Sequence, residues 1–222
     1  VPVYKIASFE NNHLPLIKKV AATKKPLIIS TGMASLGELE NALATAKKQG
    51  CKDIILLKCT STYPSSPKDS NLRTIPHLRD LFQCEVGLSD HTLGIGVAVS
   101  SIALGASIIE KHFTLSRSEG GVDSAFSLEP SEFKLLTTEI SKAWEALGSI
   151  SYGYTDSEKE SLIFRRSIYI SQDIKAGEYF NEKNLKIIRP GDGAPPSLYE
   201  KIIGKKALKN HKKGTPLRIK DL

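Results

Sequence analysis

Two histidines, His91 and His112, stand at the ends of short apolar runs, each with a polar residue two positions earlier. Ser89 precedes His91, and Glu110 precedes His112. Because residues i and i+2 of a β-strand point to the same face, each strand would direct a histidine and a hydrogen-bonding partner to one side. Two neutral imidazoles from neighbouring strands are suitable ligands for a divalent metal with open coordination positions. Each histidine taken alone has an ordinary alternative, a hydrogen-bonded core or surface residue.

Apolar runs alternate with helix-forming segments through the first 148 residues. Strands are expected over 3–8, 26–30, 53–59, 85–88 and 107–113, and helices over 14–23, 35–50, 78–82, 97–104 and 130–147. The runs are continuously apolar rather than alternating, which favours a parallel sheet covered by helices. In such α/β folds the chemistry is found at the carboxyl ends of the strands. Those ends carry Lys5, Ser8, Ser30, Thr60, Ser61, Tyr63, Ser89, His91, Glu110 and His112.

Five strands are too few to close an eight-stranded barrel, so an open doubly wound sheet is the alternative from the residues alone. Gly94-Ile95-Gly96 lacks the third glycine and the following acidic residue of a dinucleotide-binding fingerprint. A nucleotide cofactor is therefore not predicted.

Composition limits the class of partner. The chain has 222 residues and a formal net charge of +7, but its lysines are dispersed, with no arginine-rich stripe among aromatic residues, so no nucleic acid partner is expected. No apolar run approaches the roughly 18 residues of a membrane span, so no membrane partner is expected. Three cysteines without CxxC spacing favour a reducing, cytoplasmic location.

The composition changes near Gly148. We assign residues 1–148 to the α/β domain, 149–164 to a polar linker and 165–222 to a small β-rich domain. The last domain contains an internal echo, in which Lys175-Ala176-Gly177 and Lys212-Lys213-Gly214 are each followed at equal spacing by Lys and Leu. Two copies indicate a small pseudo-symmetric β module rather than a solenoid.

Six ordered motifs resemble those of the sialic acid synthases. They are Lys5-Ile6-Ala7-Ser8, Ser30-Thr31-Gly32-Met33, Cys59-Thr60-Ser61 with Tyr63-Pro64, Ser89-Asp90-His91-Thr92-Leu93-Gly94, Glu110-Lys111-His112-Phe113-Thr114 and Ser127-Leu128-Glu129-Pro130. The β-rich module with Arg189-Pro190-Gly191 resembles the antifreeze-like (SAF) domain that ends those enzymes. The resemblance implies a partial TIM (β/α)8 barrel, comprising its last five strands, followed by a SAF domain.

The resemblance also implies an activity, the metal-dependent condensation of phosphoenolpyruvate (PEP) with an open-chain amino-sugar aldehyde. Gly120 to Ser127 resembles the pseudaminic acid synthase branch, whose sugar is 2,4-diacetamido-2,4,6-trideoxy-altrose and whose products are pseudaminic acid and phosphate. The alternatives are an N-acetylneuraminate or legionaminate synthase, or a non-catalytic fragment with a sugar-binding or dimerising SAF module. The implied cofactor is Mn²⁺ or Mg²⁺.

The family's functional positions are carried over onto matching residues of this sequence. For PEP they are Lys5, Ser8, Ser30, Ser61 and Ser89, and for the metal His91 and His112. The catalytic positions are Glu110, Asp123 and Glu10, and the sugar-binding ones are Tyr63, Asp123, Phe126 and Arg189. Arg189 resembles an arginine that the family's small domain offers to the partner subunit, which implies a domain-swapped homodimer.

The resemblance implies about three further barrel strands before Val3, which carry another acid and another PEP-binding lysine. We therefore expect the chain of 222 residues to be weakly active or inactive by itself.

Overall fold

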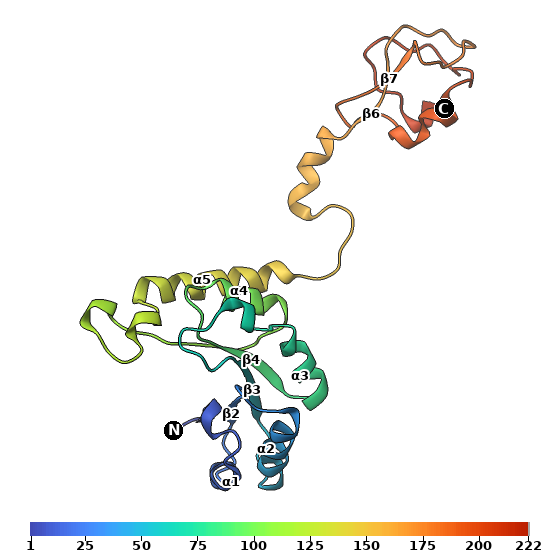
Figure 1. Ribbon diagram of the computed structural model, residues 1–222. Helices are drawn as coiled ribbons and strands as arrows, with labels where there is room; N and C mark the ends of the chain where they lie inside the picture. Colours follow the sequence, from blue (N-terminus) through green and yellow to red (C-terminus); the bar gives the residue numbers. More distant parts are fainter. Residues whose placement is uncertain (222) are drawn as a thin grey trace. The chain divides into compact units, whose positions relative to one another are not determined.

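The computed structural model describes residues 1–221, which form two compact units, Val1–Ser149 and a second unit that begins at Ile150 (Figure 1). No helix among these described residues is long and apolar enough to cross a membrane. Each unit has its own apolar core.

The first unit is a parallel half-barrel, as the sequence predicted. Its strands are β1 (Tyr4–Ile6), β2 (Leu27–Ser30), β3 (Ile54–Cys59), β4 (Glu85–Asp90) and β5 (Ile109–Lys111), and they pair in chain order. The helices between and after them are α1 (Leu14–Ala21), α2 (Leu36–Lys48), α3 (Thr74–Phe82), α4 (Gly96–Ala103) and α5 (Pro130–Leu147). Strictly sequential parallel pairing is that of a TIM barrel, whereas a doubly wound sheet reverses its strand order.

Two elements differ in length from the expectation. Helix α3 begins at Thr74, four residues earlier than predicted, because Pro76 lies in its first turn, where a missing N–H is tolerated. Strand β5 has three residues rather than seven, since Phe113 leaves the sheet and pairs with Leu128 instead. A capping box at Ser35 and Glu38 begins α2, with the Ser35 amide 2.8 Å from the Glu38 carboxylate.

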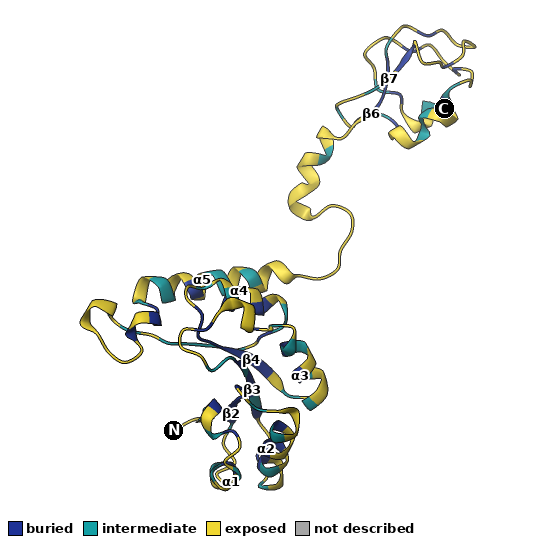
Figure 2. Cartoon of the chain, in the orientation of Figure 1, coloured by how far each residue is buried: buried dark blue, intermediate teal, exposed yellow. Residues whose placement is uncertain are grey.

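The two faces of the sheet have different chemistry. On the outer face, Ile29, Leu56 and Val86 pack with the helices in one core cluster (Figure 2). Leu57 and Cys59 point to the inner face and are buried outside that cluster. The register pairs Cys59 with Ser89 and Ser89 with Glu110, so these side chains share the inner face.

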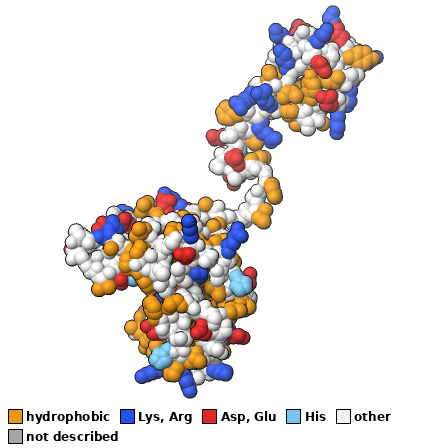
Figure 3. Space-filling model, viewed as in Figure 1, with side chains coloured by type: hydrophobic (Ala, Val, Ile, Leu, Met, Phe, Trp, Pro, Cys, Tyr) orange, Lys and Arg blue, Asp and Glu red, His pale blue; other side chains and the backbone are white. Residues whose placement is uncertain are grey.

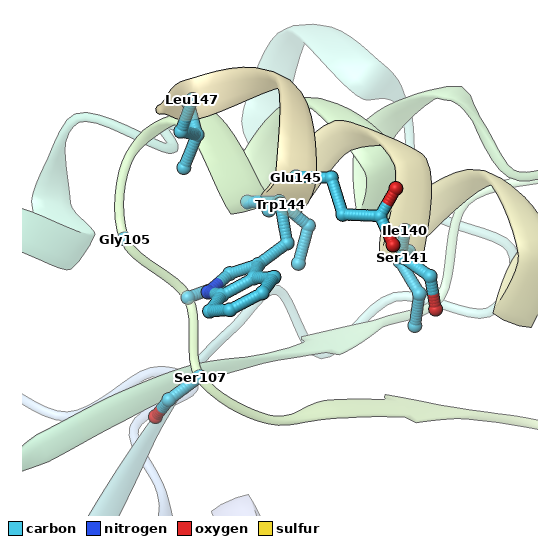
Figure 4. A pocket seen from close by; sticks show the side chains of 9 residues that line it. Gly105, Ser107, Ile140, Ser141, Trp144, Glu145 and Leu147 are labelled. Carbon is cyan, nitrogen blue, oxygen red and sulfur yellow. The ribbon is translucent and has the colours of Figure 1, made fainter. Parts of the chain in front are cut away.

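The apolar stripe of α5 is only partly covered. Leu136 is buried and Ile140 packs against the core, but Trp144 is 71% exposed. Trp144 and Leu147 line a cavity of about 590 Å³ with the loop from Gly105 to Ser107 (Figure 4). The predicted helix over 130–147 is therefore confirmed, and only its earlier turns pack against the core.

A buried ion pair joins the two strands that carry the histidines. Lys111 Nζ lies 2.7 Å from Asp90 Oδ2, and both side chains are 1% exposed. The other oxygen of Asp90 accepts from the Thr92 amide at 2.9 Å and the Thr92 hydroxyl at 2.8 Å. Asp90 and Lys111 are also register partners. The pair is therefore well satisfied, and it fixes how β5 aligns on β4.

Replacing Lys111 by Met should destabilise the chain by about 3–5 kcal/mol, because it leaves the Asp90 carboxylate buried and unpaired. Lys142→Met, which removes an exposed pair with Glu139, should change stability by less than about 0.5 kcal/mol. Urea unfolding measures both. The double change Asp90→Asn with Lys111→Met should recover part of the loss, and a double variant less stable than Lys111→Met would contradict this account.

The second unit is a small β module. After the 3-10 helix η5 (Asp156–Phe164), β6 (Ser167–Ile170) pairs antiparallel with β7 (Leu185–Ile188), and α6 (Tyr199–Ile202) follows. Its core centres on Ile168, Ile170, Phe180, Leu185 and Leu217.

Both copies of the sequence echo fold alike. Ile174 and His211, one residue before each copy, pair with each other, and Gly177 and Gly214 occupy turns with φ of 89° and 83°. Positive φ requires glycine at these two turns.

The basic charge of the chain belongs to this second unit (Figure 3). It has 15 Lys and Arg against 9 Asp and Glu, whereas residues 1–149 have 16 against 15. An anionic ligand of the half-barrel must therefore be recognised by local groups rather than by bulk charge.

His211, the only histidine after residue 149, is 6% exposed, and its Nε2 has no hydrogen-bond partner among the described residues. The ring packs 5.6 Å from Phe180. Burial lowers the pKa of His211 from its ordinary value, with Asp221 opposing and Lys209 reinforcing the effect. The folded unit therefore holds this imidazole neutral.

Stability of the second unit should fall as the pH drops below about 6.5, because the unfolded histidine takes up a proton before the folded one. His211→Phe keeps the aromatic contact and should remove this step, while the exposed His77→Phe in the first unit should not. Hydrogen exchange of β6 and β7 amides between pH 5 and 7.5 measures the effect. Equal pH dependence of the parent and His211→Phe would contradict the assignment.

Candidate active site

Polar side chains converge at the carboxyl ends of the strands on the inner face. We call this group the strand-end cluster, and its members are Lys5, Ser8, Ser30, Ser61, Ser89, His91, Glu110 and His112. It contains every residue that the sequence analysis assigned to PEP or to the metal. Parallel pairing accounts for the arrangement, since the carboxyl ends of all five strands lie at the same end of the sheet.

The cluster is linked across the concave face by Lys5 and Glu110. Lys5 Nζ lies 3.0 Å from Glu110 Oε2, and Ser89 Oγ donates to Oε1 at 2.7 Å. Strands β1 and β5 are opposite edges of the sheet, so only its curvature brings Lys5 and Glu110 together. Their side chains are 31% and 40% exposed, and an ion pair in that setting adds little stability. The pair therefore contributes little to the stability of the fold, and both charges remain accessible from the concave face.

The loops after β1 and β2 form a close-packed polar corner. The Gly32 amide donates to Ser8 Oγ at 3.1 Å. A Cβ at Gly32 would collide with the hydroxyls of Ser8 and Ser61, so this position requires glycine. Asn11, which the sequence analysis missed, donates to the carbonyls of Ser30 at 3.2 Å and Gly32 at 3.0 Å. Asn11 therefore holds the two loops together.

The Ser30 hydroxyl is buried without a partner in the described structure. Ser30 is 1% exposed at the last position of β2, and its Oγ makes no hydrogen bond. An unsatisfied buried hydroxyl costs about 1–3 kcal/mol, so native proteins rarely retain one without a ligand or water. Ser30 therefore marks a place where a bound oxygen is expected.

The two histidines face each other with ring centroids 5.2 Å apart. His91 Nδ1 lies 2.8 Å from the Thr60 carbonyl, which can only accept, so Nδ1 carries the proton and Nε2 keeps its lone pair. His112 Nδ1 lies 3.6 Å from Asp123 Oδ2. An imidazole whose second nitrogen contacts a carbonyl or carboxylate is the usual form of a metal-binding histidine.

These residues fit a catalytic rather than a structural metal. With metal–nitrogen bonds of about 2.1 Å, two rings this close can reach one ion. Within residues 1–221 no group of three or more His, Cys, Asp and Glu is arranged to hold an ion. Two protein ligands would leave most positions open for water and substrate, whereas a structural site closes all of them.

Cys59 and the histidines perturb one another. The pKa of Cys59 falls to about 7, because hydrogen bonds from His91, Ser8 and Ser61 outweigh the opposing effect of burial. Burial alone would lower the pKa of His91, but contacts with Cys59 and the Thr60 carbonyl raise it. Burial and the neighbouring His91 lower the pKa of His112. His112 is therefore neutral at neutral pH, the form that binds metals.

Aromatic rings enclose the histidine pair. Tyr63 lies 4.3 Å from His91 between ring centroids and 5.8 Å from His112, and is 41% exposed. Phe126 lies 5.1 Å from His112 and is 9% exposed. The structure thus brings these two predicted sugar residues together with the predicted metal ligands.

The remaining predicted residues have different settings. Asp123 is half-exposed beside His112. Glu10 lies two residues after Ser8, and its carboxylate forms no hydrogen bond or ion pair with the residues described. Arg189 belongs to the second unit, where it follows β7 and is exposed. The roles of all three stay predictions.

Sequence reasoning missed Asp90 and Lys111, although the signal was present. Ser89-Asp90-His91 and Glu110-Lys111-His112 place opposite charges between the residues that face the site. Period-2 alternation sends these charges to the outer face, where an unpaired charge would be unacceptable. A buried pair was therefore predictable from the same pattern that predicted the site.

A parallel half-barrel with polar groups at its strand ends defines the class of (β/α)-barrel proteins that bind ligands at that end. Residues 1–152 match the NeuB family and residues 165–222 match the SAF domain. The chain therefore belongs to the NeuB family.

Two relatives have nearly equal similarity. Pseudaminic acid synthase of Campylobacter jejuni is 44% identical over 218 residues, covering 98% of this chain and 64% of that protein. N,N'-diacetyllegionaminic acid synthase of the same species is 43% identical over 219 residues, covering 97% of this chain and 66% of that protein. The chain thus spans less than two thirds of the length of these relatives.

Solved structures show the same fold. Spore coat polysaccharide biosynthesis protein SpsE of Bacillus subtilis is 34% identical with a TM-score of 0.63, covering 99% of this chain and 67% of that one. N-acetylneuraminic acid synthetase of Leptospira borgpetersenii, in complex with citrate, is 36% identical with a TM-score of 0.67, covering 73% of this chain and 56% of that one.

Proposed function

We propose that this chain provides the PEP, metal and sugar sites of a nonulosonic acid synthase. The proposed reaction condenses PEP with the aldehyde of 2,4-diacetamido-2,4,6-trideoxy-altrose to give pseudaminic acid and phosphate. Support comes from the strand-end cluster and from relatives that are pseudaminic and legionaminic acid synthases.

The observation that carries the proposal is the unpartnered Ser30 hydroxyl. This hydroxyl is on the same face of the sheet as Lys5. Lys5 supplies a positive charge to a cluster that is rich in serine hydroxyls. PEP is an enol phosphate with a carboxylate, and such anions take charge-assisted hydrogen bonds from lysine and hydroxyl donors. We assign Lys5, Ser8, Ser30, Ser61 and Ser89 to its phosphate and carboxylate oxygens. When PEP binds, the Lys5 ammonium group would pair with PEP instead of with Glu110, and the Ser30 hydroxyl would gain a hydrogen-bond acceptor.

The metal ligands we assign are His91 and His112. A divalent ion bound to them would act as a Lewis acid toward the sugar aldehyde. Thr60 fixes the His91 tautomer, and Asp123 and Phe126 orient the His112 ring. Tyr63 covers both imidazoles and presents a partly exposed ring to a sugar.

The acidic residues would handle protons and hydroxyl groups. PEP carbon 3 bonds to the aldehyde carbon, whose oxygen takes a proton. Water adds to the cation at PEP carbon 2 and loses a proton, and phosphate leaves by C–O cleavage. Glu110, between Lys5 and Ser89, is placed to hold a proton near PEP, and Asp123 lies beside His112 at the sugar end. Glu10 is assigned the same kind of role.

A legionaminate synthase is the second candidate, because the legionaminic acid relative is as similar as the pseudaminic acid one. Buried Phe126 beside His112 favours a sugar with an apolar 6-deoxy end in either case. We assign Arg189 to the sugar from the SAF domain of a partner subunit in a swapped homodimer.

Ser30→Ala separates ligand binding from folding. Without PEP it should leave stability unchanged or raised, because it removes an unsatisfied hydroxyl. PEP at about 100 times its Kd should stabilise the parent by about 2.7 kcal/mol, and this gain should shrink in the variant. Thermal unfolding with Mn²⁺ and PEP measures the effect.

The metal arm of the same titration uses His91→Ala and His112→Ala. Both variants should abolish stabilisation by Mn²⁺. His77→Ala, which changes an exposed residue of α3, should not. If neither Mn²⁺ nor PEP stabilises the parent, or if both stabilise the variants as much as the parent, a non-catalytic fragment is favoured.

A substrate panel identifies the sugar. The full-length protein should release phosphate from PEP with the altrose derivative at a kcat/KM at least tenfold above that with N-acetylmannosamine, on the order of the discrimination that a few apolar contacts provide. Preference for N-acetylmannosamine would exclude the pseudaminic acid assignment while leaving the synthase intact.

A further inference from the structure

A loop of residues 115–127 covers the sugar end of the site. Its two ends are held at the end of β5, where the Thr114 amide donates to the Leu128 carbonyl and the Leu128 amide to the His112 carbonyl, both at 2.9 Å. The loop carries Asp123 and Phe126, which both contact the His112 ring. Whatever holds this loop therefore also determines the surroundings of His112.

Arg117 binds the loop to the start of helix α5. Its guanidinium donates to the Ser127 carbonyl at 3.0 Å and to Glu132 Oε1 at 3.1 Å. Its backbone amide donates to Glu129 Oε1 at 2.8 Å. Glu132 is at the same time the third helical residue of the α5 capping box, and its carboxylate accepts from the amide of the N-cap residue Glu129 at 2.8 Å. Arg117 therefore ties the loop to a helix that Leu136 anchors in the core.

A short chain of contacts leads from Arg117 to the site. Arg117 holds the Ser127 carbonyl, and the Ser127 hydroxyl donates to the Asp123 carbonyl at 2.7 Å. The Asp123 carboxylate then lies 3.6 Å from His112 Nδ1. Ser127 is 3% exposed, so its two hydrogen bonds are shielded from competition with water.

Among the described residues, the tip of the loop is held only by hydrogen bonds within the loop itself, such as that from the Ser124 hydroxyl to the Gly121 carbonyl at 3.1 Å. Gly120 and Gly121 have φ of 78° and 134°, and Val122 is 99% exposed. Glycines at positive φ raise the conformational entropy that ordering must overcome. The position of Asp123, next to this tip, therefore depends on the clamp at the base.

We propose that Arg117 is a positioning residue for the sugar end of the site. Its fork to Glu132 and the Ser127 carbonyl holds Asp123 and Phe126 against His112, so that the loop acts as a preformed wall for the amino sugar. The assignment of this wall to the sugar rests on the proposed function, whereas the clamp itself does not.

The test compares Arg117→Gln, Arg117→Lys and the control Lys142→Gln on the exposed side of α5. Arg117→Gln should speed hydrogen exchange of amides 118–127 at least tenfold, with β3 and β4 amides unchanged. Arg117→Lys should speed exchange of the same amides nearly as much, since lysine cannot reproduce the bidentate hydrogen bonding of the guanidinium. Lys142→Gln should match the parent. Unchanged exchange in the loop of Arg117→Gln overturns the proposal.

Kinetics of the full-length protein test the role at the site. Arg117→Gln should raise KM for the amino sugar about tenfold or more, because a displaced wall misplaces the bound substrate, and should leave KM for PEP within twofold. A loosened loop with equal changes in both KM values overturns the positioning role. If the protein proves not to condense PEP, the hydrogen-exchange result still shows whether Arg117 holds the loop. The Arg117 contact and the proposed function can therefore fail separately.

Discussion

The structure of the site depends on the buried ion pair between Asp90 and Lys111. A strand presents alternate residues to opposite faces, so a slip of one residue between β4 and β5 would exchange the faces of every side chain on β5. Such a slip would bury Glu110 and His112 against the helices and expose Lys111 to the concave face. It would also leave two unpaired charges in the outer layer, at a cost of several kcal/mol. The pair thus specifies the single register in which Ser89, His91, Glu110 and His112 face one another.

The two faces of the sheet divide stability from function. The outer face packs with the helices to form the apolar core. The inner face, by contrast, keeps an unsatisfied hydroxyl at Ser30, which is costly without a partner, beside a Lys5–Glu110 pair that adds little stability and two neighbouring imidazoles. Groups of this kind persist at positions used for binding, because the ligand supplies the interactions that the folded chain lacks.

Much of the half-barrel and of the strand-end cluster was predictable, because strand periodicity alone determines which residues share a face. Ser89 with His91 and Glu110 with His112 follow from that rule and need no tertiary information. Contacts between distant segments were not predictable in this way. The Lys5–Glu110 link requires the curvature of the whole sheet, and Asn11 acts through two loop conformations that its sequence does not specify. The exposure of Trp144 on α5 was not predictable either, since helical spacing identifies an apolar face but not what covers it.

The end of the site that carries His112 is built on β5, which with β1 is one of the two shortest strands of the sheet. Strand β5 has three residues, yet it and its loop provide Glu110, His112, Asp123 and Phe126. A strand so short has few ladder hydrogen bonds to hold it, so its precision must come from elsewhere. The buried ion pair fixes the position of β5 through Lys111. The contacts of Arg117 with Ser127 and α5 fix the position of the loop that follows β5. Both supports use charged groups with several hydrogen bonds, which are directional, whereas apolar packing alone would tolerate small displacements. Directional supports suit a site where two imidazoles and a carboxylate must stay aligned within fractions of an ångström.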